Sequence, residues 1–385
     1  LYALCLLLLF YADLYSQNIR NSNELVYQRG LLHLQLGHFD AAEQLFQTMI
    51  QNDKEDARGY YGLGRVHFTQ NPKSARARHA FARATRLDGS LADAWLYLAK
   101  SMAAQNFMLY KIRPVFQKAI MLNQNWPEAW DFWIDTCLNR RGGSAILFKD
   151  FQSALHDSPD NPIIYNRFIL TALRHYRESD AAAVLESLYD KYPKNPTIAR
   201  DLVRMLTLAG KHQKCLEVLR DMHNDSLLSK TVIYRFKALN QFADNDTVEA
   251  AQAYWESIQA LHDSSDAAIL SDDVRFISTS EEWQKLKSVP IDSLSRFYNI
   301  FWRSRDPLPS TPINERLVDH LHRLNYVSSY CRRFGNIDLF RYDSRVFLGD
   351  EILKELNIFD ARCEERSLDD MGLTIMRCGL VQHAL

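Results

Sequence analysis

The sequence has few of the residues that build turn-rich β folds. Of its 385 residues only 13 are glycine and 11 are proline, which disfavours a sandwich or barrel of short strands. It also lacks an excess of one charge, because 46 Lys and Arg are offset by 47 Asp and Glu, for a net charge of −1. Nucleic-acid binders need a basic excess to displace counterions from phosphates. We therefore expect no nucleic-acid partner.

Sequence motifs of catalysis are missing as well. There is no Gly-rich phosphate loop, no His-Glu-x-x-His and no Gly-x-Ser-x-Gly. His320 and His322 lie two residues apart, so on a helix they point to different faces. We interpret Asp272-Asp273 as a solvated loop and Asp369-Asp370 as a turn before a strand. We predict no catalytic residue, no metal site and no cofactor.

The cysteines do not form a zinc or thioredoxin-like signature, since no two are spaced Cys-x-x-Cys. We expect most of them to be small buried side chains. A Cys363–Cys378 bridge in an oxidising compartment is the alternative. The six are Cys5, Cys137, Cys215, Cys331, Cys363 and Cys378.

No apolar run reaches the roughly 20 residues that a membrane-spanning helix needs, so we expect no integral membrane span. The run Leu4–Tyr11 is short and fits the core of a secretory signal with a cut near Ser16-Gln17. We therefore predict a signal-peptide remnant at 1–16 and a secreted protein of the periplasm or cell envelope. A buried helix start and the tail of a membrane anchor remain alternatives.

What the sequence does have is a repeat of about 35 residues. Four sets of equivalent positions, which we call columns, recur at this spacing. Some columns hold bulky side chains and others small ones, which indicates stacked structural repeats. One column is Tyr60, Trp95, Trp130 and Tyr165, and another is Phe46, Phe81, Phe116 and Phe151. The third is Met49, Ala84, Ala119 and Ala154, and the fourth is Pro127 and Pro162, followed by Pro196 after 34 residues.

Each repeat is predicted to form two helices. In the first, Tyr27, Leu31 and Leu34 mark one helix, Gly37 ends it, and a second helix carries Phe46. Small residues such as Gly30, Gly64 and Ala99 allow close helix approach, and the aromatic columns fill the core. Prolines at Pro127, Pro162 and Pro196 fit the first helical turn, where a missing N–H costs nothing.

These residues resemble the tetratricopeptide repeat. The resemblance is best over Glu24–Lys54, Ala57–Gly89 and Ala92–Pro127 and weaker to Leu261. It implies a right-handed α-solenoid of helix hairpins over 23–262, followed by a connecting helical segment at 263–290. The family resemblance also implies a concave face, lined by the first helix of each pair, that binds a peptide or partner protein.

The repeat register predicts which side chains line that face. Their charge alternates from basic to acidic to basic, which favours a peptide carrying both signs. The alternative is that they are solvated polar positions on a helix surface. The predicted lining comprises Arg58, Tyr61, Arg65, Phe68, Lys100, Asp131, Asp135, Asn166, Arg200 and Arg204.

The last third of the chain carries a different pattern, helix, proline-rich turn and helix. Phe297, Ile300, Phe301 and Ser304 predict one apolar stripe, and Asp306-Pro307 ends that helix. Thr311 is predicted to cap a second helix that starts at Pro312 and turns Leu317, Leu321 and Leu324 inward, with Tyr326 or Val327.

This stretch resembles the GWxTD-domain family, known from the Bacteroidota. The later Asp369–Gly379 section departs from it, since Met371 and Cys378 replace the family's Arg and His. We expect a small α+β domain over 291–385 that is truncated or diverged. We also expect that the sequence comes from a gene fragment. The family motif is matched by Phe301, Trp302, Arg305, Asp306, Pro307, Pro309, Thr311, Asn314 and Glu315.

Two hypotheses follow. The first is a cell-envelope scaffold that binds a partner peptide in the solenoid. The second is an enzyme or anion-binding domain around Arg305, Asp306 and Glu315, with the repeats recruiting its target. An internal salt-bridge lattice between two helices would explain the same motif residues.

Overall fold

The computed structural model describes residues 23–225, 227–243, 246–275 and 277–330. Every regular element in these residues is a helix. The chain divides into two compact units, and the division lies between Leu147 and Phe148, inside one helix. The predicted signal at 1–16, the α+β portion beyond 330 and the cysteines Cys5, Cys331, Cys363 and Cys378 lie outside the described residues.

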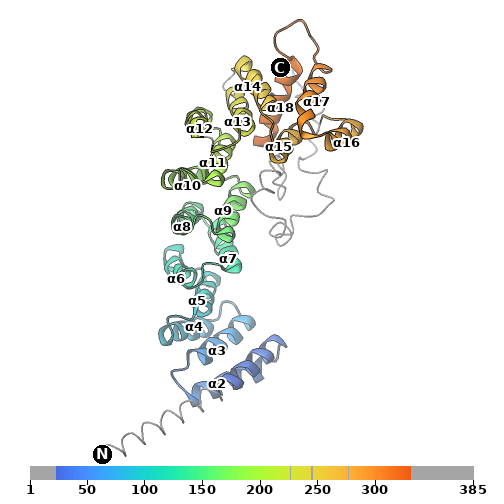
Figure 1. Ribbon diagram of the computed structural model, residues 1–385. Helices are drawn as coiled ribbons and strands as arrows, with labels where there is room; N and C mark the ends of the chain where they lie inside the picture. Colours follow the sequence, from blue (N-terminus) through green and yellow to red (C-terminus); the bar gives the residue numbers. More distant parts are fainter. Residues whose placement is uncertain (1–22, 226, 244–245, 276, 331–385) are drawn as a thin grey trace, which may run out of the picture. The chain divides into compact units, whose positions relative to one another are not determined.

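In unit 1, the described residues up to Leu147, successive helices pack against each other in chain order (Figure 1). A first helix covers 23–35. It is followed by α2 (Phe39–Asn52), α3 (Ala57–Gln70), α4 (Ala75–Leu87), α5 (Ala92–Ala104), α6 (Leu109–Leu122), α7 (Pro127–Leu138) and α8 (Gly143–Asp157), which continues into unit 2.

The repeat columns build the core of unit 1. Phe46, Phe81 and Phe116 are fully buried. Glycine lets the first helices approach them, because a Cβ on Gly62 would lie 2.3 Å from the ring of Phe46 and one on Gly64 2.6 Å from Phe81. Gly37 ends the first helix with a φ of +77°, a conformation that glycine adopts without strain. The predicted helix pairs are thereby confirmed in this unit.

Unit 2 starts at Phe148, and several of its successive helices pack against each other as pairs. Pro162 is the first residue of α9 (Pro162–Arg174) and Pro196 of α11 (Pro196–Leu208), as Pro127 is of α7, so the predicted role of the prolines is confirmed. Its helices are α9 (Pro162–Arg174), α10 (Glu178–Lys191), α11 (Pro196–Leu208), α12 (His212–Asp225), α13 (Lys230–Ala243), α14 (Thr247–Gln259), α15 (Ser264–Arg275), α16 (Ser280–Ser288), α17 (Ile291–Arg303) and α18 (Glu315–Tyr330).

The expectation of a solvated loop at Asp272-Asp273 is wrong. Both residues lie in α15 and are buried, and Asp273 is 1% exposed. Arg235 on α13 donates from Nε and Nη2 to the two oxygens of Asp273, at 2.8 and 2.7 Å. The hydroxyl of Tyr254 lies 3.4 Å from the same carboxylate. A bidentate partner from another helix makes this aspartate a core residue.

Two details of the last helices also differ from expectation. Ile300 is 61% exposed, because α17 buries the neighbouring face that carries Leu294, Tyr298 and Trp302. The second helix starts at Glu315 rather than Pro312, and Asn314, not Thr311, accepts the hydrogen bond of the Leu317 N–H, at 2.8 Å. The inward positions Leu317, Leu321 and Leu324 are buried as predicted, whereas the side chains at 326 and 327 lie outside the described ones.

Candidate functional site

The predicted lining of unit 1 forms a strip of cations against tyrosine rings. We call Arg58, Arg65, Tyr97 and Lys100, on α3 and α5, the cation strip. The guanidinium carbon of Arg65 lies 4.3 Å from the centre of the Tyr97 ring, and Nζ of Lys100 lies 5.0 Å from it. Arg65 also donates to the hydroxyl of Tyr61, at 2.9 Å. One aromatic ring therefore supports two positive charges.

The charges of the strip differ in how they are neutralised. Arg58 pairs with Glu24 and Asp56, the residue that caps α3. Neither Arg65 nor Lys100 makes an ion pair with any described residue. Burial, together with the nearby Arg65 charge, lowers the pKa of Lys100. Asp93 lies near both cations and offsets part of their charge. Because no described carboxylate lies within ion-pair distance of either cation, the remaining charge favours an anionic ligand.

Other predicted lining residues of unit 1 do not share this environment. Tyr61 is 4% exposed and packs in the core with Phe81 and Tyr97. Phe68 is partly buried and meets the same rings edge-on. Asp131 and Asp135 on α7 are exposed. Thus α7 contributes the acidic side chains and α3 and α5 the basic ones.

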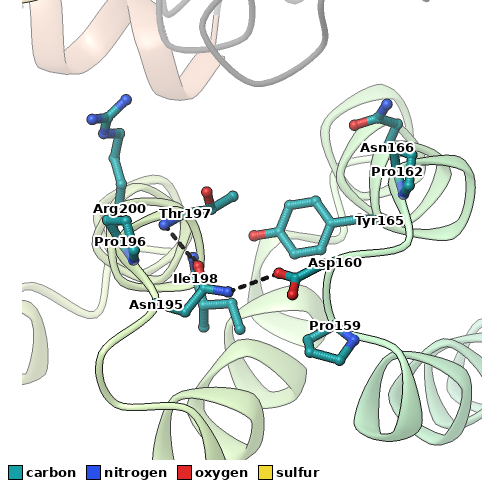
Figure 2. Close-up of a pocket in the computed structure, with 10 residues that line it drawn as sticks. All are labelled: Pro159, Asp160, Pro162, Tyr165, Asn166, Asn195, Pro196, Thr197, Ile198 and Arg200. Carbon is teal, nitrogen blue, oxygen red and sulfur yellow. Dashed lines mark hydrogen bonds between the residues drawn. The ribbon is translucent and has the colours of Figure 1, made fainter.

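In unit 2 the first helices α9 and α11 frame a pocket of about 370 Å³ (Figure 2). Two residues predicted from the repeat register, Asn166 and Arg200, line it and stand on opposite sides in Figure 2. The ring of Tyr165 extends from α9 toward α11 between them. The complete lining is Pro159, Asp160, Pro162, Tyr165, Asn166, Asn195, Pro196, Thr197, Ile198 and Arg200.

Two Asn-Pro pairs fix the walls of this pocket. Asn161 caps α9 and Asn195 caps α11, each accepting hydrogen bonds from two N–H groups of the first turn, and a proline follows each cap. Asn195 also donates from Nδ2 to Asp160, at 3.2 Å, which links the two loops (Figure 2). Because the caps already satisfy these N–H groups, a ligand must rely on side chains for its hydrogen bonds.

Asn166 is the notable polar group of the pocket. It is 3% exposed, and its Nδ2 donates to no other described atom. Its neighbour Tyr165 donates its hydroxyl to Asp201 on α11, at 2.8 Å, and burial raises the pKa of that phenol. A buried amide that keeps an unused donor is costly unless a ligand or water accepts from it.

Not every predicted residue faces the pocket. Arg204 is 1% exposed and lies 3.8 Å from Asp201 one turn earlier, so it belongs to the buried polar interior rather than to an open face. Conversely, the prediction omitted Tyr165, Asp160 and Asn195. The two Asn-Pro pairs, 34 residues apart, were the signal that could have located the pocket loops.

The C-terminal motif side chains form hydrogen bonds and an ion pair with the adjoining helices. Arg305 donates from Nη2 to both carboxylate oxygens of Glu282, at 2.8 and 2.6 Å, and lies 3.7 Å from the centre of the Phe301 ring. Asn314 donates to the carbonyl of Trp302, at 2.7 Å. Glu315 lies 2.6 Å from the hydroxyl of Thr311, which lowers its pKa. These bonds join α16, α17 and α18 through the turn.

Among the described residues, no group of three His, Cys, Asp or Glu lies close enough to hold a metal ion. Within the same residues, no helix has the length and apolar character to cross a membrane. His320 is fully buried and His322 exposed, so they do point to different faces, and the buried thiols Cys137 and Cys215 match the expectation for cysteine.

Comparison with known proteins supports the repeat assignment. Residues 27–72 match the tetratricopeptide repeat family. No curated protein matches the chain. A tetratricopeptide repeat protein from Parabacteroides merdae is similar in structure, with 11% identity over 63% of this chain and 95% of its own and a TM-score of 0.33. PilF of Pseudomonas aeruginosa matches at 13% identity over 70% and 99%, with a TM-score of 0.29.

YrrB, described as a tetratricopeptide repeat protein with an unusual peptide-binding site, is also similar. The identity is 13%, over 58% of this chain and 95% of that one, with a TM-score of 0.26. The sequence match at 27–72 covers the first helix pair and α3, whose packing is described above. The family match supports tetratricopeptide repeats in this part of the chain.

Proposed function

We propose that this protein is a scaffold that binds an extended segment of a partner protein along the first helices of its repeats. The observation that carries the proposal is Asn166, a buried amide in the α9–α11 pocket whose Nδ2 donates to no described atom. A peptide carbonyl or carboxylate entering the pocket would accept from it. Tetratricopeptide repeats serve more generally as interaction scaffolds than as enzymes, which fits this role.

The charges of the first helices suggest what a segment bound to each unit carries. Arg65 and Lys100 favour an acidic side chain opposite the cation strip. The exposed Asp131 and Asp135 favour a basic one opposite α7. In unit 2, Arg200 adds a positive side chain to the pocket wall. Charge-assisted hydrogen bonds of this kind give both affinity and direction to a bound peptide.

A display experiment tests the proposal. Random peptides would be selected on the purified full chain, and their dissociation constants measured by fluorescence anisotropy. Asn166→Ala should weaken the selected peptides about tenfold, because a buried hydrogen bond is lost. Asn123→Ala, at an exposed position after α6, is the matched control and should leave binding unchanged. Equal binding by the Asn166→Ala and Asn123→Ala variants would contradict the proposal.

We also propose that the scaffold works in the cell envelope. The support is the apolar run Leu4–Tyr11 followed by Ser16-Gln17. Fusing 1–30 to alkaline phosphatase, which is active only after export, should give an active enzyme. Replacing Leu7 and Leu8 by Arg should abolish that activity. An inactive wild-type fusion would contradict the location while leaving the peptide-binding proposal intact.

A further inference from the structure

A second pocket lies in unit 2, on helices that do not line the first one. It has a volume of about 420 Å³ and is formed by α12 and α13 with one residue from α14. Its size falls in the range of small-molecule sites. The lining residues are Leu216, Leu219, Arg220, His223, Ile233, Tyr234, Lys237, Gln241 and Glu256.

One part of this pocket is apolar and well supported. Leu219 and Ile233 are 2% and 3% exposed, so they form a floor that belongs to the packed interior. The ring of Tyr234 lies 5.7 Å from that of His223, which closes a wall between α12 and α13. Leu216, one turn before Leu219, extends the floor. An apolar ligand side chain placed against this floor would be transferred out of water, which is favourable, without distorting the helices.

The remaining groups carry charge of both signs. Arg220 and Lys237 are cations that make no ion pair with any described residue. Glu256 is the one carboxylate of the lining and receives a hydrogen bond on Oε1 from Gln252, at 3.2 Å. Gln241 holds a buried Oε1 that accepts from no other described atom. The pocket thus offers donors for an anion and acceptors for a cation around one apolar floor.

We propose that this pocket binds a free apolar α-amino acid. Its carboxylate is held by Lys237 and Arg220, its ammonium group by Glu256 and Oε1 of Gln241, and its side chain by Leu216, Leu219, Ile233 and Tyr234. A zwitterion with an apolar side chain matches all three kinds of lining group at once. A simple acid would give Glu256 no cation and Oε1 of Gln241 no donor, and a simple amine would give Arg220 and Lys237 no anion.

The test uses three probes on the full chain by isothermal titration calorimetry. They are L-phenylalanine, 3-phenylpropanoate, which lacks the amine, and phenethylamine, which lacks the carboxylate. L-Phenylalanine should bind at least about tenfold more tightly than either partial analogue. Lys237→Met should weaken phenylalanine and phenylpropanoate about tenfold but not phenethylamine, and Glu256→Gln should weaken phenylalanine and phenethylamine but not phenylpropanoate.

Matched controls remove the same charges outside the pocket. Lys230→Met on α13 and Glu281→Gln on α16 are at exposed positions and should change none of the three affinities. Circular dichroism of each variant checks that the helices persist. The proposal is overturned if phenylalanine shows no heat of binding at about 10 mM, or if both pocket variants affect all probes alike.

A last arm separates the free amino acid from the end of a polypeptide. The tripeptide Gly-Gly-Phe keeps the carboxylate and side chain but replaces the ammonium group by an amide N–H. It should bind about tenfold less tightly than phenylalanine, because Glu256 then faces no cation. Tighter binding of the tripeptide would overturn the proposal and assign the pocket to a chain terminus. None of these results depends on the peptide affinities measured for Asn166.

Discussion

The first helices of the two units share one repeat spacing but bury their side chains differently. In unit 1, the buried residues of α3 and α5 are apolar or small, and the cations Arg58, Arg65 and Lys100 are half-buried. In unit 2, α9, α11 and α13 are buried along nearly their whole length, including the polar residues Asn166, Asp201 and Arg235. The repeat sets which residues are helical, whereas the surroundings of each helix decide whether a polar side chain is surface or core.

The two units also differ in the residues that allow neighbouring helices to pack closely. Unit 1 brings helices together over glycine, as Gly30, Gly62 and Gly64 do against Phe46 and Phe81. In unit 2 the first helices hold no glycine, and side-chain bonds such as Tyr165–Asp201 and Arg235–Asp273 join successive repeats. We therefore expect unit 2 to be more sensitive than unit 1 to the removal of a buried charged side chain.

The largest effect is expected from breaking the buried ion pair of unit 2. Arg235→Met should destabilise the protein by about 3–5 kcal/mol, because Asp273 is left charged in the interior. Arg58→Met in unit 1, whose ion pairs are partly exposed, should cost no more than about 1 kcal/mol. Urea unfolding followed by circular dichroism measures both. Equal losses in the free energy of unfolding for Arg235→Met and Arg58→Met would contradict the difference between the units.

A smaller effect comes from His320 in unit 2. Burial, with a further contribution from Arg316, lowers its pKa to about 3, against about 6.5 in an unfolded chain. As the pH falls, the histidine of the unfolded chain therefore binds a proton before that of the folded chain. The contribution of His320 to the free energy of unfolding is fully present above pH 6.5 and is lost as the pH falls toward 3. By pH 5 the loss is about 2 kcal/mol.

His320→Leu should remove this pH dependence, while His322→Ala, at an exposed neighbour, should retain it. The measurement is the urea midpoint between pH 7 and pH 5 for the three proteins. A midpoint that falls as steeply in His320→Leu as in the wild type would assign the acid sensitivity to other groups.

Glycine packing in unit 1 predicts the next effect. Gly62→Ala should destabilise by roughly 1–2 kcal/mol, since overpacking against Phe46 outweighs the better helix propensity of alanine. Gly89→Ala, where the nearest atom to a new Cβ is 3.9 Å away, serves as the control and should be near neutral. A stabilised Gly62→Ala variant would show that the close approach is not required.

The smallest effect on stability is expected at the cation strip. Arg65→Met should cost less than about 1 kcal/mol, because it removes a cation–π contact and one hydrogen bond at a half-buried site. The same variant should weaken acidic peptides from the display selection. A stability loss as large as that of Arg235→Met would instead make Arg65 a structural residue.

The sequence predicted the helices of the repeats well, because bulky and small residues recur at one interval and prolines mark helix starts. It did not predict the environment of Asp273, because its partner Arg235 lies 38 residues away and meets it only through packing between repeats. Ile300 was assigned to an apolar stripe with Phe297, Phe301 and Ser304 from their helical spacing, although α17 buries the adjacent face that carries Leu294, Tyr298 and Trp302.

The candidate site was predicted in part for the same reason. Asn166 and Arg200 follow from the repeat register, and both line the α9–α11 pocket. Arg204, one turn after Arg200, was assigned to the same surface but is buried beside Asp201. A register gives the direction of a side chain, and only the neighbouring helices show whether solvent reaches it.

Photo-cross-linking tests the binding surface most directly. p-Benzoylphenylalanine would be placed at Thr197, on the wall of the α9–α11 pocket, and, as a control, at Ala183, an exposed position of α10. With the peptides selected by display, the proposal predicts a cross-linked product at Thr197 and none at Ala183. Cross-linking at Ala183 but not at Thr197 would contradict binding along the first helices.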